Sequence, residues 1–126
     1  MDSLDLSDKA SKRLKITKEM ANAINIVAKK YCKPKYDGIW RIYTFRKDKE
    51  NINPERFRVF KTRTLFGKEV PAVHIMDIFF SEPNKTITIQ IVALKLILNL
   101  NEADKMLLQN SLKDVAKGWS IVIIQK

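Results

Sequence analysis

Apolar residues near the N-terminus recur at the spacing of an amphipathic helix. They follow one another at intervals of four, three and four positions, at Met20, Ile24, Val27 and Tyr31. This spacing places them on one stripe of a helix. The hydroxyl of Thr17 can cap the start of the helix, and Pro34 requires it to end. Residues 1–16 show no such period, so we expect a mobile N-terminal arm before a single domain that spans 17–126.

Alternating and β-branched residues then predict four strands. The strands cover residues 39–46, 55–66, 69–80 and 85–98. The charged run 47–50 predicts a polar loop, while Gly67 and the segment 81–84 supply turn residues. Pro71, near the start of the third strand, predicts an edge position or a bulge because proline lacks a backbone donor. In the fourth strand the apolar phase switches at Ile91–Val92, which predicts a bulge or a sharp bend there.

A second helix and a last strand complete the pattern. Asn101 can cap this helix, and Asp104 lies in its first turn. Its apolar stripe comprises Leu108, Leu112 and Val115. The helix should end near Gly118, and a short strand follows from Trp119 to Gln125.

This order of elements predicts an α+β fold. We expect an antiparallel sheet of four to five strands, with an N-terminal helix and a C-terminal helix packed on one face. The other face of such a sheet can remain open. The segment Ser120–Ile124 is largely apolar on both faces, which would promote aggregation at an exposed edge. We therefore expect it to be central in the sheet or buried in a homodimer.

Charge narrows the class of protein. The chain of 126 residues carries 24 Lys and Arg against 14 Asp and Glu, a net charge of +10. Between Lys29 and Lys68, thirteen basic residues stand against four acidic ones, which leaves +9 of that total. A lysine-rich surface with no specific ligand is one interpretation of the charge. Its concentration in one segment favours nucleic acid as the partner.

Composition also indicates where the protein works. The chain has one cysteine, Cys32, and it opens with a polar segment that lacks the apolar core of a secretory signal. We therefore expect an intracellular protein, in the cytoplasm or nucleus of a cell or host. Apolar runs such as 121–124 are too short to span a membrane, so we expect no membrane partner.

Residues for catalysis are scarce. The one histidine, His74, and the one cysteine cannot supply a zinc site in a single copy of the chain. Three glycines provide no phosphate-binding loop. We therefore expect neither catalysis nor a cofactor or metal. Glu69, Asp77 and Glu82 leave a metal-dependent nuclease open as an alternative.

Aromatic residues coincide with the charge excess. Eight of the 11 aromatic residues lie between Tyr31 and Phe66, and the first two predicted strands alternate rings with cations. Successive side chains of a strand point to opposite faces, so Trp40 and Phe57 suit the core, where we also expect Phe66. The candidate nucleic-acid-binding residues are Arg41, Tyr43, Arg46, Arg56, Arg58, Phe60, Lys61, Arg63 and Lys68. Tyr43 and Phe60 are the stacking candidates, and the cations suit phosphates.

Lys61 and Arg63 share the parity of Phe57 along the second strand. They must therefore lie past the edge of the core or after a bulge.

Taken together, these patterns predict a non-catalytic protein that binds single-stranded nucleic acid, with DNA favoured over RNA. A small viral protein that binds and inhibits a host protein is an alternative, since a basic chain also suits an acidic protein target.

The segment Lys95–Leu108 runs from a predicted strand, through a leucine and a polar cap, into an amphipathic helix. It resembles the end of the core of the transcriptional coactivator positive cofactor four. Whirly proteins and small single-stranded-DNA-binding proteins of hyperthermophilic archaea and their viruses have similar layouts. The resemblance implies an antiparallel sheet crossed by a helix, a dimer, and single-stranded DNA bound on the sheet.

Overall fold

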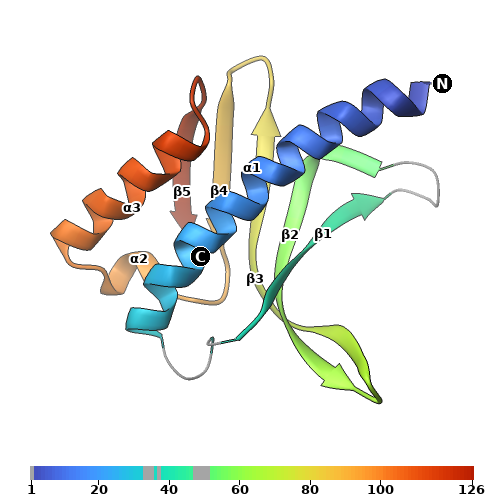
Figure 1. The fold of residues 1–126 in the computed structure, drawn as a ribbon. Coiled ribbons are helices and arrows are strands. Elements are labelled where there is room, and N and C mark those ends of the chain that lie inside the picture. Colours follow the sequence, from blue (N-terminus) through green and yellow to red (C-terminus); the bar gives the residue numbers. More distant parts are fainter. Residues whose placement is uncertain (1, 33–35, 37, 47–51) are drawn as a thin grey trace.

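The computed structural model describes residues 2–32, 36, 38–46 and 52–126 of the chain. Within these residues, the two long helices lie on one face of a five-stranded sheet (Figure 1). The elements are, in order, α1 (Asp2–Tyr31), β1 (Trp40–Arg46), β2 (Ile52–Leu65), β3 (Lys68–Ser81), β4 (Thr86–Ile91), α2 (Leu96–Asn99), α3 (Glu102–Val115) and β5 (Ser120–Gln125). The predicted α+β class is confirmed. The polar loop predicted at 47–50 lies outside the described residues.

The strands follow their sequence order across the sheet, from β1 to β5. The first four strands are antiparallel neighbours, whereas β5 runs parallel to β4. A parallel neighbour requires a crossover connection, and α2 and α3 supply it. The crossover brings β5 to the outer side of β4, so β5 forms an edge of the sheet. The prediction that this strand is central is therefore wrong.

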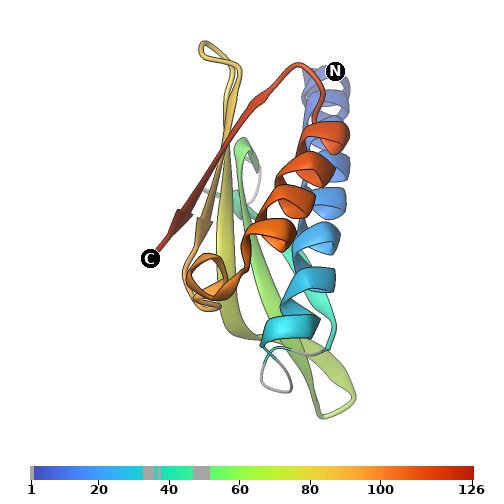
Figure 2. The ribbon, with the colours of Figure 1, turned by 90° about the vertical axis from the view of Figure 1, so that its left-hand side faces the viewer.

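The core lies between the sheet and the two long helices. Figure 2 shows α1 and α3 side by side on one face of the sheet. The strand residues on that face are fully or almost fully buried, namely Phe57, Val59, Met76, Ile78, Phe80, Ile87, Ile89 and Ile91. Met20 and Ile24 of α1 and Leu108 and Leu112 of α3 cover them. Since side chains alternate along a strand, the residues between these core positions face away from the helices.

The hairpin formed by β2 and β3 extends beyond its neighbours. β1 pairs with β2 only as far as Lys61, and β4 pairs with β3 only from Met76 onward. We call the remaining paired segment, Thr62–Pro71, the hairpin arm. Register shifts after Val59 and after Lys61 interrupt the β2–β3 ladder, and the arm curls toward the helix side (Figure 2). The prediction of an edge or a bulge at Pro71 is confirmed.

Helix α1 begins at Asp2, well before the predicted start at Thr17. The hydroxyl of Thr17 donates to the carbonyl oxygen of Arg13 at 2.7 Å, so it lies inside the helix and caps nothing. Arg13 is only 4% exposed. Its guanidinium lies 2.6 Å from a carboxylate oxygen of Glu82 and 5.4 Å from the ring centroid of Phe80. These contacts let a charged residue occupy a core position of the helix.

The two long helices are joined by a polar contact. The hydroxyl of Tyr31 and the ammonium of Lys30, at the end of α1, both donate to the carboxylate of Asp104. The hydrogen bond from Tyr31, followed by that from Lys30, holds the pKa of Asp104 below its usual value. The side chain of Asn101 accepts from the Asp104 amide at 2.8 Å, which confirms the predicted cap of α3. Among the described residues, no helix is both long and apolar enough to cross a membrane.

Strand β4 ends at Ile91, and the predicted strand through Leu98 is wrong. Lys95 adopts a left-handed conformation with φ 47°, which ends the extended chain, and the one-turn helix α2 follows. Leu94, Leu96 and Leu100 bury their side chains on the core from this bent segment. The apolar phase switch after Ile91 therefore marks the end of the strand.

Candidate nucleic-acid interface

Five of the predicted binding residues, Arg41, Tyr43, Arg56, Arg58 and Phe60, share the face of the sheet that the helices leave uncovered, and four of them pair across β1 and β2. In the β1–β2 register, Arg41 lies opposite Phe60, and Tyr43 lies opposite Arg58. Directly opposed residues of an antiparallel pair lie on the same face. All four alternate with core residues such as Val59, so they face away from α1 and α3. We call Arg41, Tyr43, Arg58 and Phe60 the open-face cluster.

The two rings of this cluster, together with the imidazole of His74 on β3, form a row across three strands. Tyr43 and Phe60 meet edge to face, with centroids 5.5 Å apart and planes at 85°. Phe60 stacks on the imidazole of His74 at 4.9 Å, and His74 Nε2 lies 2.6 Å from a carboxylate oxygen of Asp77. Tyr43 and Phe60 are half-buried, so part of each ring remains accessible. Ring contacts of this kind fix the side chains before any ligand binds.

The arginines of this face lie close to acidic or aromatic partners. Arg41 donates to the carboxylate of Glu69 from Nε at 2.7 Å. This hydrogen bond lowers the pKa of Glu69, so the carboxylate stays charged and offsets Arg41. Arg58 lies opposite Asp77 in the β2–β3 register. Arg56, also on this face, holds its guanidinium 4.8 Å from the ring centroid of Phe79.

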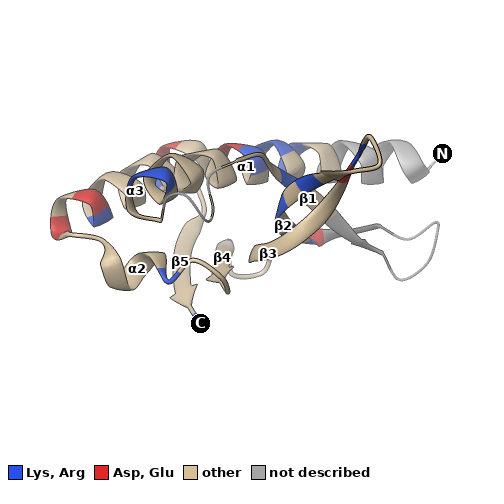
Figure 3. Cartoon of the chain, turned by 90° about the horizontal axis from the view of Figure 1, so that it is seen from below, with Lys and Arg blue, Asp and Glu red and all other residues tan. Residues whose placement is uncertain are grey.

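The other predicted cations do not join the open-face cluster. Lys61 and Arg63 keep the parity of Phe57 along β2 and extend past the core, as the sequence predicts. Lys68 pairs with Leu65 and shares that side of the hairpin arm. Figure 3 shows Lys and Arg on β1 and β2 and at the tip of the arm, which rises to the level of the helices. The side chain of Arg46 lies outside the part of the chain that the structure describes.

Phe66 is the exposed aromatic residue that the sequence analysis assigned to the core, and that prediction is wrong. It lies at the tip of the hairpin arm, and 94% of its surface is exposed. Phe66 and Gly67 have φ values of 50° and 74°, the left-handed pattern of a type I′ hairpin turn. Asparagine or glycine is usual at the first of these positions, because a bulky residue is strained there. The adjacent Gly67 is the sequence signal that could have placed Phe66 in the turn.

Replacing Phe66 with asparagine is expected to raise the free energy of unfolding by about 0.5–1 kcal/mol, because asparagine tolerates the left-handed conformation. The exposed ring contributes little packing that could be lost. Urea unfolding followed by circular dichroism measures the change. The matched control is Phe66→Ala, which removes the same ring without the favourable turn chemistry. A Phe66→Asn protein no more stable than Phe66→Ala would contradict the strain at this position.

The carboxylates considered for a nuclease site have separate partners. Glu69 binds Arg41, and Asp77 binds His74. Glu82 lies between Lys85, at 2.9 Å, and Arg13. The hydrogen bond from Lys85, with a further one from Arg13, lowers the pKa of Glu82. Within the described residues, no group of three or more histidine, cysteine or acidic side chains could hold a metal ion.

The geometry thus brings Arg41, Tyr43, Arg56, Arg58 and Phe60 onto one helix-free face. Such a surface offers cations beside partly exposed rings. Comparisons of this chain with protein-family models, with curated proteins and with solved structures find no match.

Proposed function

We propose that the protein binds single-stranded nucleic acid, with DNA favoured over RNA, and performs no chemistry on it. One observation supports the proposal most directly. The pairing of β1 with β2 sets each arginine of the open-face cluster opposite an aromatic ring, on a face that no helix covers. A single strand needs cations for its phosphates and flat rings for its unstacked bases. The open-face cluster provides both within two adjacent strands.

The shape of this face favours a single strand over a duplex. No helix projects from it among the described residues, so it has no element that can enter the major groove (Figure 2). A flat sheet can instead support splayed bases, and each stacked base contributes about 1–3 kcal/mol. The hairpin arm adds a second contact region, since the exposed ring of Phe66 lies near Arg63 and Lys68 in the sequence. In a duplex, stacking between neighbouring base pairs would hide the base faces that these rings need.

Binding of labelled single-stranded and duplex oligonucleotides at two salt concentrations tests the proposal. We expect tighter binding of the single strand and little sequence preference. A plot of log affinity against log salt concentration should have a slope of about −0.7 for each phosphate contact. DNA and RNA of the same sequence, compared in the same assay, give the strand preference. Equal and weak binding to single strands and duplexes would leave only general electrostatic attraction and would refute the proposal.

A further inference from the structure

The two edges of the sheet differ in how they resist pairing with another chain. The β1 edge carries Arg41 and a register shift between Thr44 and Phe45, and both features discourage the addition of a strand. The β5 edge, Ser120–Gln125, contains no charged residue and no proline. Its pairing with β4 is regular from end to end. Of the two edges that the described strands form, the β5 edge alone lacks the usual defences against pairing.

The backbone of β5 presents hydrogen-bonding groups outward. The amide of Ser120 donates to the carbonyl of Lys85 at 2.8 Å, and the amide of Lys126 donates to that of Ile91 at 2.8 Å. Backbone groups alternate sides along a strand, so the even-numbered residues of β5 pair with β4. The amides and carbonyls of Ile121, Ile123 and Gln125 consequently point away from the sheet, where no described strand follows.

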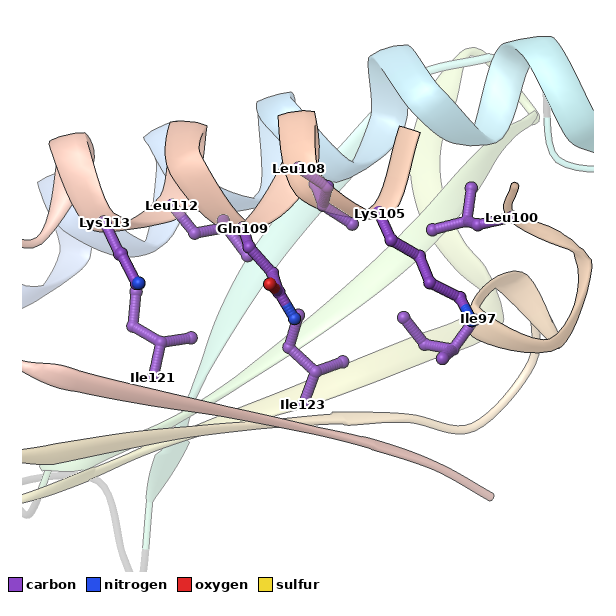
Figure 4. Close-up of a pocket in the computed structure, with 9 residues that line it drawn as sticks. All are labelled: Ile97, Leu100, Lys105, Leu108, Gln109, Leu112, Lys113, Ile121 and Ile123. Atoms are coloured by element: carbon purple, nitrogen blue, oxygen red, sulfur yellow. The ribbon is translucent and has the colours of Figure 1, made fainter. Parts of the chain in front are cut away.

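The side chains at this edge are apolar on both faces. Val122 and Ile124 lie on the helix-free face and are 45% and 41% exposed. Ile121 and Ile123 point toward α3, where they line a crevice of about 310 Å³ with Leu108 and other residues (Figure 4). An edge strand that is apolar on both faces is a surface that proteins normally cover.

We propose that a second copy of this chain covers the β5 edge by antiparallel pairing across a two-fold axis at Ile123. Each Ile123 then lies opposite its counterpart, and each Ile121 lies opposite Gln125 of the second copy. In each of these pairs the two opposed residues exchange both backbone hydrogen bonds, as in the hydrogen-bonded pairs of an antiparallel ladder. Every outward amide and carbonyl of β5 is then paired. Val122 lies opposite Ile124 of the second copy, so the exposed apolar side chains meet on the same face. The result is a continuous sheet of two five-stranded halves.

Symmetry favours a second copy over an unrelated strand. The β5 sequence is self-complementary in this register, because each apolar side chain on the helix-free face opposes another. An isologous contact also closes on itself, so assembly stops at two copies and the edge is removed. An unrelated partner would match this pattern only by having an equivalent sequence.

The strong positive charge of the chain does not oppose this contact. Among the described residues, Arg41, Arg56, Arg58, Lys61, Arg63 and Lys68 lie on β1, β2 and the start of β3, away from the β5 edge. Neighbouring strands are about 4.8 Å apart, so nine spacings separate the two β1 edges of the dimer by about 43 Å. That distance is several times the Debye length of about 8 Å at physiological salt. The inference is also independent of the proposed nucleic-acid binding.

Light scattering of the full chain after size-exclusion chromatography, over a dilution series, tests the inference with two double variants. Val122→Lys with Ile124→Lys places introduced ammonium groups opposite one another, and we expect the dimer dissociation constant to rise by at least about tenfold. Val122→Lys with Ile124→Glu places opposite charges in both symmetric pairs, and we expect the dimer to persist. Ile26→Lys, at an exposed apolar position of α1, is the control and should remain dimeric.

Circular dichroism tests whether each variant is folded, and we expect that it is because Val122 and Ile124 are only partly buried. A wild-type chain that stays monomeric would overturn the inference. A dimer in both double variants would show that β5 is not the interface. Loss of the dimer in both would overturn the register at Ile123. Only dissociation of the double-lysine variant, with retention of the lysine–glutamate variant, supports it.

Discussion

Replacing Phe57 with alanine is expected to lower the free energy of unfolding by about 3–5 kcal/mol. Phe57 is completely buried on the helix-facing side of β2. Its ring meets that of Phe80 edge to face, with centroids 5.8 Å apart. Removing the ring loses the free energy gained by its transfer from water to the core. It also leaves a cavity under α1, which packs on β2. A sheet fixed by neighbours on both sides cannot collapse into that space.

Urea unfolding followed by circular dichroism and tryptophan fluorescence measures this loss. The matched control is Phe79→Ala, which removes the same ring from the other face of β3, where it is half-buried. Phe79 holds a contact with Arg56, so its removal has a cost, but we expect that cost to be less than half of the Phe57 value. Equal losses in the two variants would contradict the placement of the core on the helix side only.

Reversing the charge of Arg58 is expected to weaken binding of single-stranded DNA by at least about tenfold at low salt. Arg58 lies opposite Tyr43 in the centre of the open-face cluster. The substitution Arg58→Glu removes a phosphate contact and adds repulsion at the same point. The salt dependence should also become shallower by about 0.7 logarithmic units, because one fewer counterion-releasing contact forms. Fluorescence anisotropy with a labelled oligonucleotide measures both quantities.

Two further variants separate a local contact from net charge. Lys117→Glu changes the net charge by the same amount in the exposed turn after α3, and it should weaken binding far less than Arg58→Glu. Glu69→Gln removes the carboxylate that offsets Arg41 and should tighten binding. If Lys117→Glu and Arg58→Glu weakened binding equally, the open-face cluster would have no special role.

The alternation of the sequence predicted the sheet and the faces of β2 correctly. Phe57 and Val59 point to the core, and Arg58 and Phe60 point away, because a strand has a period of two whatever its surroundings. Local patterns could not give the pairing of Arg41 with Glu69, which are far apart in the chain. They also could not place β5, because parallel or antiparallel pairing depends on the path of the connection.

The local apolar pattern does not indicate the start of α1, for a similar reason. Arg13 occupies a core position, and its charge interrupts the apolar stripe that would otherwise extend toward the N-terminus. The residues that make this burial possible, Glu82 and Phe80, follow much later in the chain. A pattern that examines only near neighbours therefore interprets Arg13 as a solvent-facing residue.

The segment 92–98 shows the limit of periodicity over short stretches. Its apolar residues alternate as in a strand, but a short apolar run fits a bent chain or a helical turn equally well. Leu94, Leu96 and Leu100 reach the core from such a bend, in which Lys95 adopts a left-handed conformation. A left-handed lysine has no sequence signature, so the bend at Lys95 could be identified only in three dimensions.

The position of α1 beside α3 determines the order in which the molecule can be completed during synthesis. The strands β1 to β4 join through successive hairpins, which are local contacts that form early. Helix α1 ends at Tyr31, yet its partner α3 begins only at Glu102. In a growing chain, the side of α1 that packs on α3 therefore remains uncovered until α3 has left the ribosome. Chains interrupted before Glu102 expose this apolar surface, which makes them targets for chaperones and prone to aggregation.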